Sequence, residues 1–260
     1  MSECQRFYKV LLRIFLFVMF LFITLPVRAA VDGTAAGDLA PHEVPASVRS
    51  LNVASAVGPV LMRELEVKGL SLGSPVFMRA FKEERELEVW VEREGGFQLF
   101  RTYPIAAVSG WLGPKRWEGD LQAPEGFYRV MPSQMNPNSR FHLSFDIGYP
   151  NDFDRMKYCT GSALMVHGKK TSRGCFAMTD EKIEEIYVLA DAALRNGQPF
   201  FQFHSFPFRM TDQNMERNRD SKWFDFWKNL KTGYDLFEAY QRPPKVFVES
   251  GRYGFDCHGS

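Results

Sequence analysis

The segment VHGKKTSRGCFAMT, Val166–Thr179, concentrates reactive and cationic side chains between an apolar run and a predicted helix. His167 ends the apolar run, and Cys175 follows eight positions later. Between them lies a polar loop that begins and ends with glycine, Gly168–Gly174. Four interpretations fit this composition: a thiol with its base, a phosphate-binding loop, a metal site, or ordinary turn chemistry before a helix.

The spacing of these residues argues against a phosphate-binding loop and against a metal site. A Walker A motif has four residues between its first glycine and the Gly-Lys pair, whereas six separate Gly161 from Gly168. The residue after Lys169 is lysine, where that motif has serine or threonine. A metal site needs three or four ligands, and His167 and Cys175 have no CxxC or HxxxH partner nearby. We therefore predict no metal site and no dissociable cofactor.

The two remaining interpretations both stay open on the residues alone. A cysteine is often a small buried apolar residue, and a lone histidine is often a hydrogen-bonded core group. Alternatively, a strand ending at His167 and a glycine-bounded loop can bring the Cys175 thiol beside the imidazole. The imidazole and the loop's cations would then lower the thiol pKa, which is ordinarily about 8.5. Backbone N–H groups near Gly174 could stabilise an oxyanion, which would complete an acyl-transfer site.

The rest of the chain predicts a mainly β core, a sandwich or barrel-like fold with a few helices. Short runs of alternating apolar and polar residues, separated by glycine and proline, are typical of half-buried strands. The predicted strands are Val76–Phe81, Leu87–Val91, Phe97–Tyr103, Phe127–Val130, His142–Ile147, Ala163–Val166, Pro199–Phe206 and Lys245–Val248, and Ile105–Gly110 is expected to extend the sheet of the first hairpin.

The clearest predicted helix is Thr179–Leu194, whose apolar residues form one stripe at helical spacing. Thr179 is expected to cap this helix, and Asn196-Gly197 is expected to end it. Residues 49–72 are amphipathic and predicted to be helical in part. Residues 212–240 are polar with spaced aromatic residues, which also predicts helix.

The first 29 residues have the layout of a secretory signal peptide. A basic start precedes an apolar run, Ile14–Thr24, that is short for a spanning helix, and Ala29 suits a cleavage site. An uncleaved N-terminal anchor is the less favoured alternative. The predicted organisation is therefore a signal peptide over 1–29, a linker with a short helical segment over 30–73, a folded domain with a C-terminal helical extension over 74–253, and a tail over 254–260.

Charge and cysteine content agree with an exported protein. Loss of residues 1–29, which carry three more basic than acidic residues, changes the formal net charge from +1 to −2. A near-neutral chain has no general electrostatic reason to bind nucleic acid. Removal of Cys4 leaves Cys159, Cys175 and Cys257. This odd count favours one disulfide and one free thiol, and we predict a Cys159–Cys257 pair with Cys175 free.

The order His-Gly followed by Ser-x-Gly-Cys resembles the catalytic signature of YkuD-type L,D-transpeptidases, and the chain is most similar to the YafK group of that family. The resemblance implies a YkuD-like β-sandwich catalytic domain. It also implies that Cys175 is the nucleophile, that His167 is the general base and acid, and that Ser172 and Gly174 shape the loop and the oxyanion site. The segments that carry it are Pro75–Arg79, Leu87–Trp90, Gly119-Asp120, Pro124–Tyr128, Met135–Arg140, Gly148–Asn151, Met165–Gly168, Gly174–Thr179 and Pro207–Thr211.

The resemblance further implies a periplasmic enzyme that acts on peptidoglycan stem peptides with a diaminopimelate centre. Cys175 would attack a carbonyl beside that residue and form a thioester, which an amine or water then resolves. The same site could work as an amidase that releases outer-membrane lipoprotein from peptidoglycan. Two further hypotheses are an inactive cell-wall binding protein and a disulfide-exchange protein with Cys159 as the resolving thiol.

The chain departs from the common family pattern at two positions. Many members carry Ser-His-Gly-Cys and an arginine two residues after the cysteine, whereas this chain has Arg173 and Ala177 at those places. The loop between His167 and Cys175 is also shorter than usual. The YafK group shares the Phe-Ala-Met-Thr ending, so these differences argue against ordinary 3-3 cross-linking and point to a different acyl donor or acceptor.

The basic loop and a second histidine each have two interpretations. Lys169, Lys170 and Arg173 are either solvated or bind the carboxylates of the stem peptide, with Gly168 allowing close approach. On the second interpretation, Gly168, Lys169 and Arg173 bind substrate. His204 is either a second active-site histidine or, as we favour, a strand residue.

Overall fold

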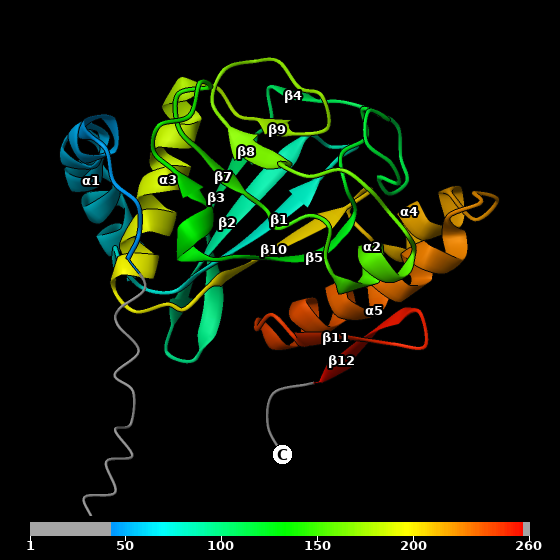
Figure 1. Cartoon of the computed structure of the whole chain (residues 1–260). Coiled ribbons are helices and arrows are strands. Elements are labelled where there is room, and N and C mark those ends of the chain that lie inside the picture. The colour runs from blue at the N-terminus through cyan, green and yellow to red at the C-terminus, as the bar shows by residue number, and fades with distance from the viewer. Residues whose placement is uncertain (1–42, 257–260) are drawn as a thin grey trace, which may run out of the picture. The chain divides into compact units, whose positions relative to one another are not determined.

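The structure is a computed structural model that describes residues 43–256 (Figure 1). The chain divides into two units, Met1–Asp38 and Leu39–Ser260, and all described residues belong to the second. The predicted signal peptide and Cys257 lie outside the described residues, and with them the predicted Cys159–Cys257 disulfide. Within residues 43–256, none of the helices combines the length and hydrophobicity needed to cross a bilayer.

The first of two five-stranded sheets is built from the predicted N-terminal hairpin and a late strand. Its central strand β1 runs antiparallel to β2 and parallel to β10, although more than a hundred residues separate β1 from β10. The predicted strands in this sheet are confirmed to within a few residues. In spatial order the strands are β3 (Gly96–Pro104), β2 (Glu86–Arg93), β1 (Val76–Phe81), β10 (Phe201–Phe206) and β5 (Gly126–Val130).

The second sheet is made of very short strands and carries the His167–Cys175 segment. Its spatial order is β4 (Ala107–Val108), β9 (Phe176–Ala177), β8 (Met165–His167), β7 (Ser144–Asp146) and β6 (Met135–Asn136).

Membership of β4 in this second sheet corrects the expectation that Ile105–Gly110 extends the hairpin sheet. The chain changes sheets between two adjacent residues, because the Ile105 N–H donates to Arg85 and the Ala106 N–H donates to Ala177. Alternation along a single strand shows which face is buried, but it does not show which sheet the backbone joins.

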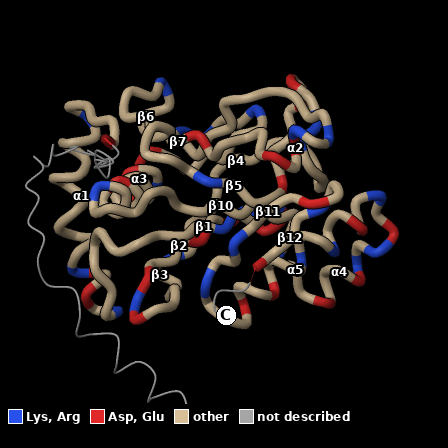
Figure 2. The backbone as a smooth tube through the Cα atoms, turned by 60° about the horizontal axis from the view of Figure 1, so that its bottom comes forward, with Lys and Arg blue, Asp and Glu red and all other residues tan. Residues whose placement is uncertain are grey.

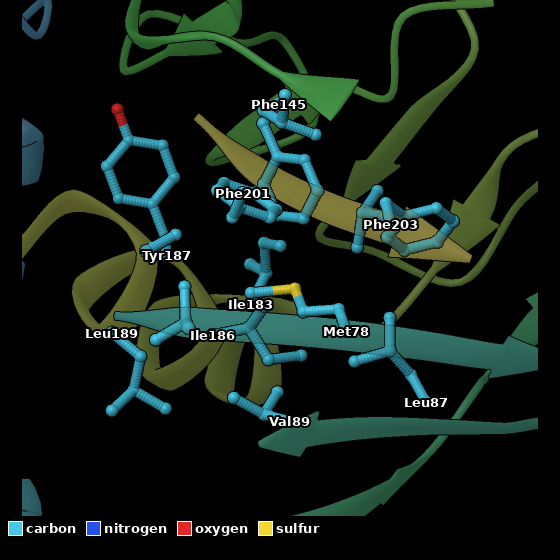
Figure 3. Close-up of a cluster of buried hydrophobic side chains, with 14 of the residues drawn as sticks. Met78, Leu87, Val89, Phe145, Ile183, Ile186, Tyr187, Leu189, Phe201 and Phe203 are labelled. Atoms are coloured by element: carbon cyan, nitrogen blue, oxygen red, sulfur yellow. The ribbon is translucent and has the colours of Figure 1, made fainter. Parts of the chain in front are cut away.

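The main core lies between the first sheet, the second sheet and helix α3 (Asp180–Arg195). Figure 3 shows Ile183 of α3 and Met78 of β1 in this layer, with Phe145 of β7 directed toward Phe201 of β10. The Phe145 and Phe201 rings lie edge to face with centroids 5.3 Å apart. Burial of these apolar side chains anchors α3 and the second sheet to the first sheet.

The opposite face of the first sheet is covered by the predicted C-terminal helices. Phe77 of β1 contacts Phe237 with ring centroids 4.7 Å apart. The covering elements are α4 (Asp212–Arg217), α5 (Phe224–Tyr240) and a hairpin of β11 (Lys245–Glu249) and β12 (Arg252–Asp256). Because β12 reaches Asp256, the expectation that a tail begins at residue 254 is corrected.

Charged residues of both signs lie along α4 and α5, as Figure 2 shows. Several of them pair one helical turn apart, such as Lys231 with Asp235 at 2.7 Å. Such exposed pairs contribute only a few tenths of a kcal/mol each, so apolar burial under α5 holds this layer in place.

One prediction about α1 (Val48–Val67) is confirmed, and one about the start of α3 is wrong. Helix α1 confirms helix within residues 49–72, and it packs on α3. Thr179 precedes α3, but its φ of 77° turns it away from a capping geometry and its side chain makes no cap hydrogen bond. The predicted Thr179 cap is therefore wrong. Two short elements complete the fold, α2 (Asp152–Met156) and the 3-10 turn η2 (Pro132–Gln134).

Candidate active site

His167 is the last residue of β8 and is buried, with 4% of its surface exposed. Its Nδ1 lies 2.5 Å from the Gly168 carbonyl oxygen. Since a carbonyl only accepts, Nδ1 carries the proton and Nε2 is left as an acceptor. Burial lowers the pKa of His167, and the Gly168 carbonyl partly offsets this effect. The imidazole is therefore neutral near pH 7 and suited to take up a proton.

Cys175 lies directly before β9, beside Met165 of the neighbouring strand β8. Its Sγ accepts the Met165 N–H at 3.4 Å and lies 3.9 Å from the Ala163 carbonyl oxygen. Burial raises the pKa of the thiol and the Asp146 carboxylate raises it further, while the Met165 N–H and the Lys115 ammonium act in the opposite direction. The resting thiol is therefore protonated.

This resting state corrects one expectation. The thiol pKa is not lowered by the lysines and arginine of the Gly168–Gly174 loop, because Lys115 is the cation that acts on it. A reaction at Cys175 would therefore need proton transfer from the thiol to a neutral base, since no preformed thiolate is present.

Parallel pairing of β8 and β9 places the thiol and the imidazole on one face of the sheet. His167 pairs with Ala177, and Cys175 lies two positions earlier, so the two side chains project the same way. Among the hydrogen bonds of residues 43–256, none joins the two directly, but both side chains line one cavity. A group bound there contacts both.

The shared cavity has a volume of about 830 Å³, which is within the range of small-molecule sites. Its walls combine two exposed arginines, polar groups from the segment after β6, and the Phe141 ring, whose centroid lies 4.6 Å from that of His167. The lining residues are Asn136, Asn138, Ser139, Arg140, Phe141, Ala163, Met165, His167, Thr171, Ser172, Arg173 and Cys175. Cationic and amide groups of this kind suit a ligand with carboxylates and peptide bonds.

A chain of hydroxyl groups holds the backbone around Cys175. The Ser172 Oγ donates to the Cys175 carbonyl at 2.7 Å. Ser109 Oγ lies 3.2 Å from Ser172 Oγ and accepts the Gly174 N–H at 2.5 Å. Since the Ser172 proton is used, Ser109 donates to Ser172. The Gly174 N–H is thus already bonded, which corrects its expected role as an oxyanion donor.

Gly174 has a conformational role instead. Its φ of +104° is unfavourable for other residues, and an added Cβ would lie 3.0 Å from the Gln122 carbonyl oxygen. Sequence analysis missed Ser109, because it lies far from the loop along the chain. The β4–β9 pairing, in which Val108 opposes Phe176, brings Ser109 opposite Cys175.

We expect Ser109→Ala to lower kcat on the order of tenfold with a smaller effect on KM. Removal of the hydroxyl leaves the buried Gly174 N–H without an acceptor and takes away the donor to Ser172, which costs about 1–3 kcal/mol and loosens the cysteine loop. Steady-state kinetics should be compared with Ser71→Ala, an exposed serine after α1. Wild-type kcat in Ser109→Ala would show that the network does not position Cys175.

Of the three predicted substrate-binding residues, Arg173 is the one that lines the cavity within the described part of the chain. Gly168 is buried, and an added Cβ would lie 2.5 Å from Asp180 Oδ1, so its role is structural and the prediction is corrected. Lys169 is exposed, and its backbone N–H donates to Asp180 at 2.8 Å. Arg140, which was not predicted, lines the cavity, whereas Lys169 was predicted to bind substrate and does not line it.

His204 is confirmed as a strand residue of β10. It is fully buried, with its ring 4.6 Å from Phe77 and 4.7 Å from Phe127. Burial holds its pKa well below the ordinary value. Within residues 43–256, no group of three or more His, Cys, Asp or Glu side chains is arranged to hold a metal ion.

Comparison with known proteins places the site in a family context. Residues 80–200, which include His167 and Cys175, match the model of the YkuD L,D-transpeptidase catalytic domain. Over 188 residues the chain is 47% identical to YafK of Escherichia coli strain K12, a protein named as an L,D-transpeptidase. This alignment covers 72% of the chain and 76% of that protein.

Two solved structures show more distant similarity. One is a variant of the helical cell shape determining protein Pgp2 from Campylobacter jejuni, with a TM-score of 0.43 and 21% identity. That match covers 66% of this chain and 63% of the other, which is less than two thirds of its length. The other is Bd1075 from Bdellovibrio bacteriovorus, with a TM-score of 0.38 and 19% identity over 71% of this chain and 84% of the other.

Proposed function

Because the chain belongs to the L,D-transpeptidase family, we propose that it is a cysteine-dependent acyl-transfer enzyme that acts on peptidoglycan stem peptides with a diaminopimelate centre. One observation carries this proposal: the β8–β9 pairing presents the Cys175 thiol and the His167 imidazole to one cavity. The Ser109–Ser172 network that holds the cysteine loop supports it.

The proposed first step forms a thioester. Cys175 Sγ attacks the carbonyl carbon of a peptide bond beside diaminopimelate, and His167 Nε2 accepts the thiol proton. The carbon–nitrogen bond then breaks, and His167 returns the proton to the departing amine. The Nδ1–Gly168 hydrogen bond holds the ring in the tautomer that this exchange requires.

The second step releases the acyl group. An amine acceptor attacks the thioester, His167 takes its proton, and the proton returns to the Cys175 sulfur as the carbon–sulfur bond breaks. This gives transpeptidation, whereas water as the acceptor gives hydrolysis. The chemistry at Cys175 is the same in both cases, so the acceptor decides the product.

A second candidate function is hydrolytic release of outer-membrane lipoprotein attached to peptidoglycan. Ala177 favours an acceptor different from that of the broader family, whose members often carry arginine two residues after the cysteine. Ala177 is fully buried and lies between Ala107 and His167 in the sheet. An arginine side chain has no space there, so the acceptor cannot be bound by a cation at that position.

We expect Arg173→Ala and Arg140→Ala each to raise KM about tenfold with little change in kcat. Both side chains line the cavity, where they would pair with carboxylates of the stem peptide. The matched control is Lys169→Ala, an exposed cation of the same loop that lies outside the cavity lining. An equal rise in KM for Lys169→Ala would indicate a general electrostatic field instead of paired recognition.

The acceptor is tested by mass spectrometry of products. The protein and its Cys175→Ala variant are incubated with sacculi carrying attached lipoprotein and with free tetrapeptide muropeptides. Loss of terminal D-alanine with new 3-3 dimers or new lipoprotein attachment identifies a transpeptidase. Cys175-dependent release of lipoprotein identifies a hydrolase. Absence of any product favours a cell-wall binding protein and contradicts the proposed function.

We propose a periplasmic location, supported by the basic start, apolar run and small residues of the first 29 positions. The mature protein is expected to begin at Ala30 and to fractionate with the periplasm. N-terminal peptide mapping of the isolated protein tests this, and a retained N-terminus would instead indicate a membrane anchor.

A further inference from the structure

Three large aromatic side chains are exposed on two neighbouring loops beside the Cys175 cavity. The exposed fractions are 85% for Trp111, 57% for Trp117 and 91% for Tyr158. We refer to these three residues as the aromatic rim. Trp111 and Tyr158 bury little of their surface in the core, so they contribute little to folding. Their grouping beside the site suggests a role in binding.

Trp111 is tied to the backbone that carries the nucleophile. It lies two residues after Ser109, which accepts the Gly174 N–H, and two residues span at most about 7 Å. The Trp111 N–H donates to Gln122 Oε1 at 2.5 Å. The Gln122 backbone in turn packs against Gly174. Trp111 is therefore held beside the cysteine loop.

Trp117 is connected to the other side of the thiol. Its carbonyl accepts from the buried Lys115 Nζ at 2.9 Å, and Lys115 packs against Gly161. Gly161 lies two residues before Ala163, whose carbonyl oxygen is 3.9 Å from the Cys175 Sγ. The backbone of the second tryptophan is therefore linked, through Lys115, to the segment that carries Ala163.

Tyr158 completes the rim from the loop between α2 and β8. The Thr160 N–H donates to the Arg116 carbonyl at 2.9 Å, and the Glu118 N–H donates to the Thr160 hydroxyl at 3.0 Å. These bonds join this loop to the loop after β4, and Figure 1 shows both loops on the same side of the second sheet.

The loop that bears the tryptophans is rigid. The Asp120 carboxylate accepts the backbone N–H groups of Arg116, Trp117 and Gln122, and it pairs with Lys115 at 2.6 Å. Below it, a buried Lys82–Glu125 ion pair binds both the N–H and the carbonyl of Gly113. The backbone that bears the two tryptophans is thus held in place before any ligand arrives, which lowers the entropic cost of binding.

We propose that the aromatic rim binds the glycan strand of peptidoglycan by stacking its rings on the apolar faces of the amino sugars. This inference rests on the proposed function, since it assigns the sugar portion of the same substrate. An extended stem peptide of three residues spans about 10 Å, and the proposal requires that this length joins a sugar on the rim to a peptide bond at Cys175. The rim would therefore direct the enzyme to polymeric peptidoglycan.

The charges around the rim favour a saccharide over a lipid surface. Exposed Arg116 and exposed Glu118 flank Trp117 and carry opposite signs. An anionic bilayer would repel Glu118, whereas both side chains can hydrogen-bond to hydroxyl and acetamido groups of a sugar. A pyranose presents an apolar face and a polar edge. An aromatic ring can stack on the face while Arg116 and Glu118 hydrogen-bond to groups at the edge.

Binding is tested without catalysis. Cys175→Ala protein is titrated calorimetrically with glycan strands from which the stem peptides have been removed. We expect Trp111→Ala with Trp117→Ala to weaken binding at least about tenfold. Tyr240→Ala, an aromatic residue 63% exposed on α5, should leave binding unchanged. Because these side chains are exposed, unchanged thermal unfolding should accompany each substitution.

Several results would overturn the proposal. One is that the double variant binds glycan as tightly as the Cys175→Ala parent. Another is that the parent binds no glycan. A third is Trp-dependent binding to anionic phospholipid vesicles without binding to glycan. A second measurement compares kcat/KM on sacculi with kcat/KM on a sugar-free tetrapeptide, where the rim variants should be impaired on sacculi alone. Failure of the proposed function would abolish turnover on both substrates yet leave the calorimetric result intact, so the two failures can be distinguished.

Discussion

Cys175→Ala protein is expected to form no acyl-enzyme and to lose at least about a thousandfold in kcat. The thiol is the nucleophilic side chain that lines the cavity, and alanine cannot form the thioester through which both product classes arise. Intact-mass spectrometry after incubation with a tetrapeptide muropeptide measures the adduct, and product analysis measures turnover. The wild-type mass should increase by that of the acyl group.

The matched control for this substitution is Cys159→Ala. Cys159 is also a half-buried cysteine, but it does not line the cavity. Its replacement should preserve both acylation and turnover. Loss of activity in Cys159→Ala would instead support the disulfide-exchange hypothesis with Cys159 as resolving thiol. An acyl adduct on Cys175→Ala protein would contradict the assignment of the nucleophile.

Replacement of His167 by glutamine is expected to lower kcat about 10²- to 10⁴-fold. The thiol pKa is raised by burial, so little thiolate exists at neutral pH and the reaction depends on proton transfer to the imidazole. Glutamine fills a similar volume, but it accepts no proton. KM should change much less, because Arg140 and Arg173 still line the cavity. Steady-state kinetics and the rate of acyl-enzyme formation both measure the effect.

The pH profile distinguishes a base from a structural residue. Burial lowers the pKa of His167 below its ordinary value of 6.5. The protonated ring cannot accept the thiol proton, so wild-type kcat/KM should fall as pH decreases through a pKa below 6.5. His167→Gln should abolish this acid limb. His142→Gln is the control, because His142 bonds Glu184 at 2.7 Å outside the cavity lining. An unchanged limb in His167→Gln would exclude His167 as the base.

Local patterns in the sequence predicted most elements of the fold. Alternation of apolar and polar residues located β1 and β10 and the hairpin, because burial on one face of a sheet repeats every second residue. The apolar stripe of residues 179–194 predicted α3 for the same kind of reason at helical spacing. Sequence was less reliable where the backbone conformation is set by contacts at a distance, as at Thr179 and in the short strand β4.

The candidate site divides in the same way. Residue types alone predicted the proposed chemistry, because His167 and Cys175 lie on either side of a glycine-bounded loop. The sequence also placed Arg173 in that loop. It did not indicate Ser109 or Arg140, which lie in separate segments and reach the site through the second sheet and its flanking loops.

The arrangement of these groups and their resting protonation states depend on the folded chain. The parallel pairing of β8 with β9 sets the common face of thiol and imidazole, and the β4–β9 pairing brings Ser109 to the cysteine loop. Burial then raises one pKa and lowers the other, so both groups are neutral. The physical reason is that side-chain chemistry and local periodicity are properties of neighbouring residues. Strand pairing and desolvation, in contrast, depend on segments that are distant in sequence and meet only in the folded chain.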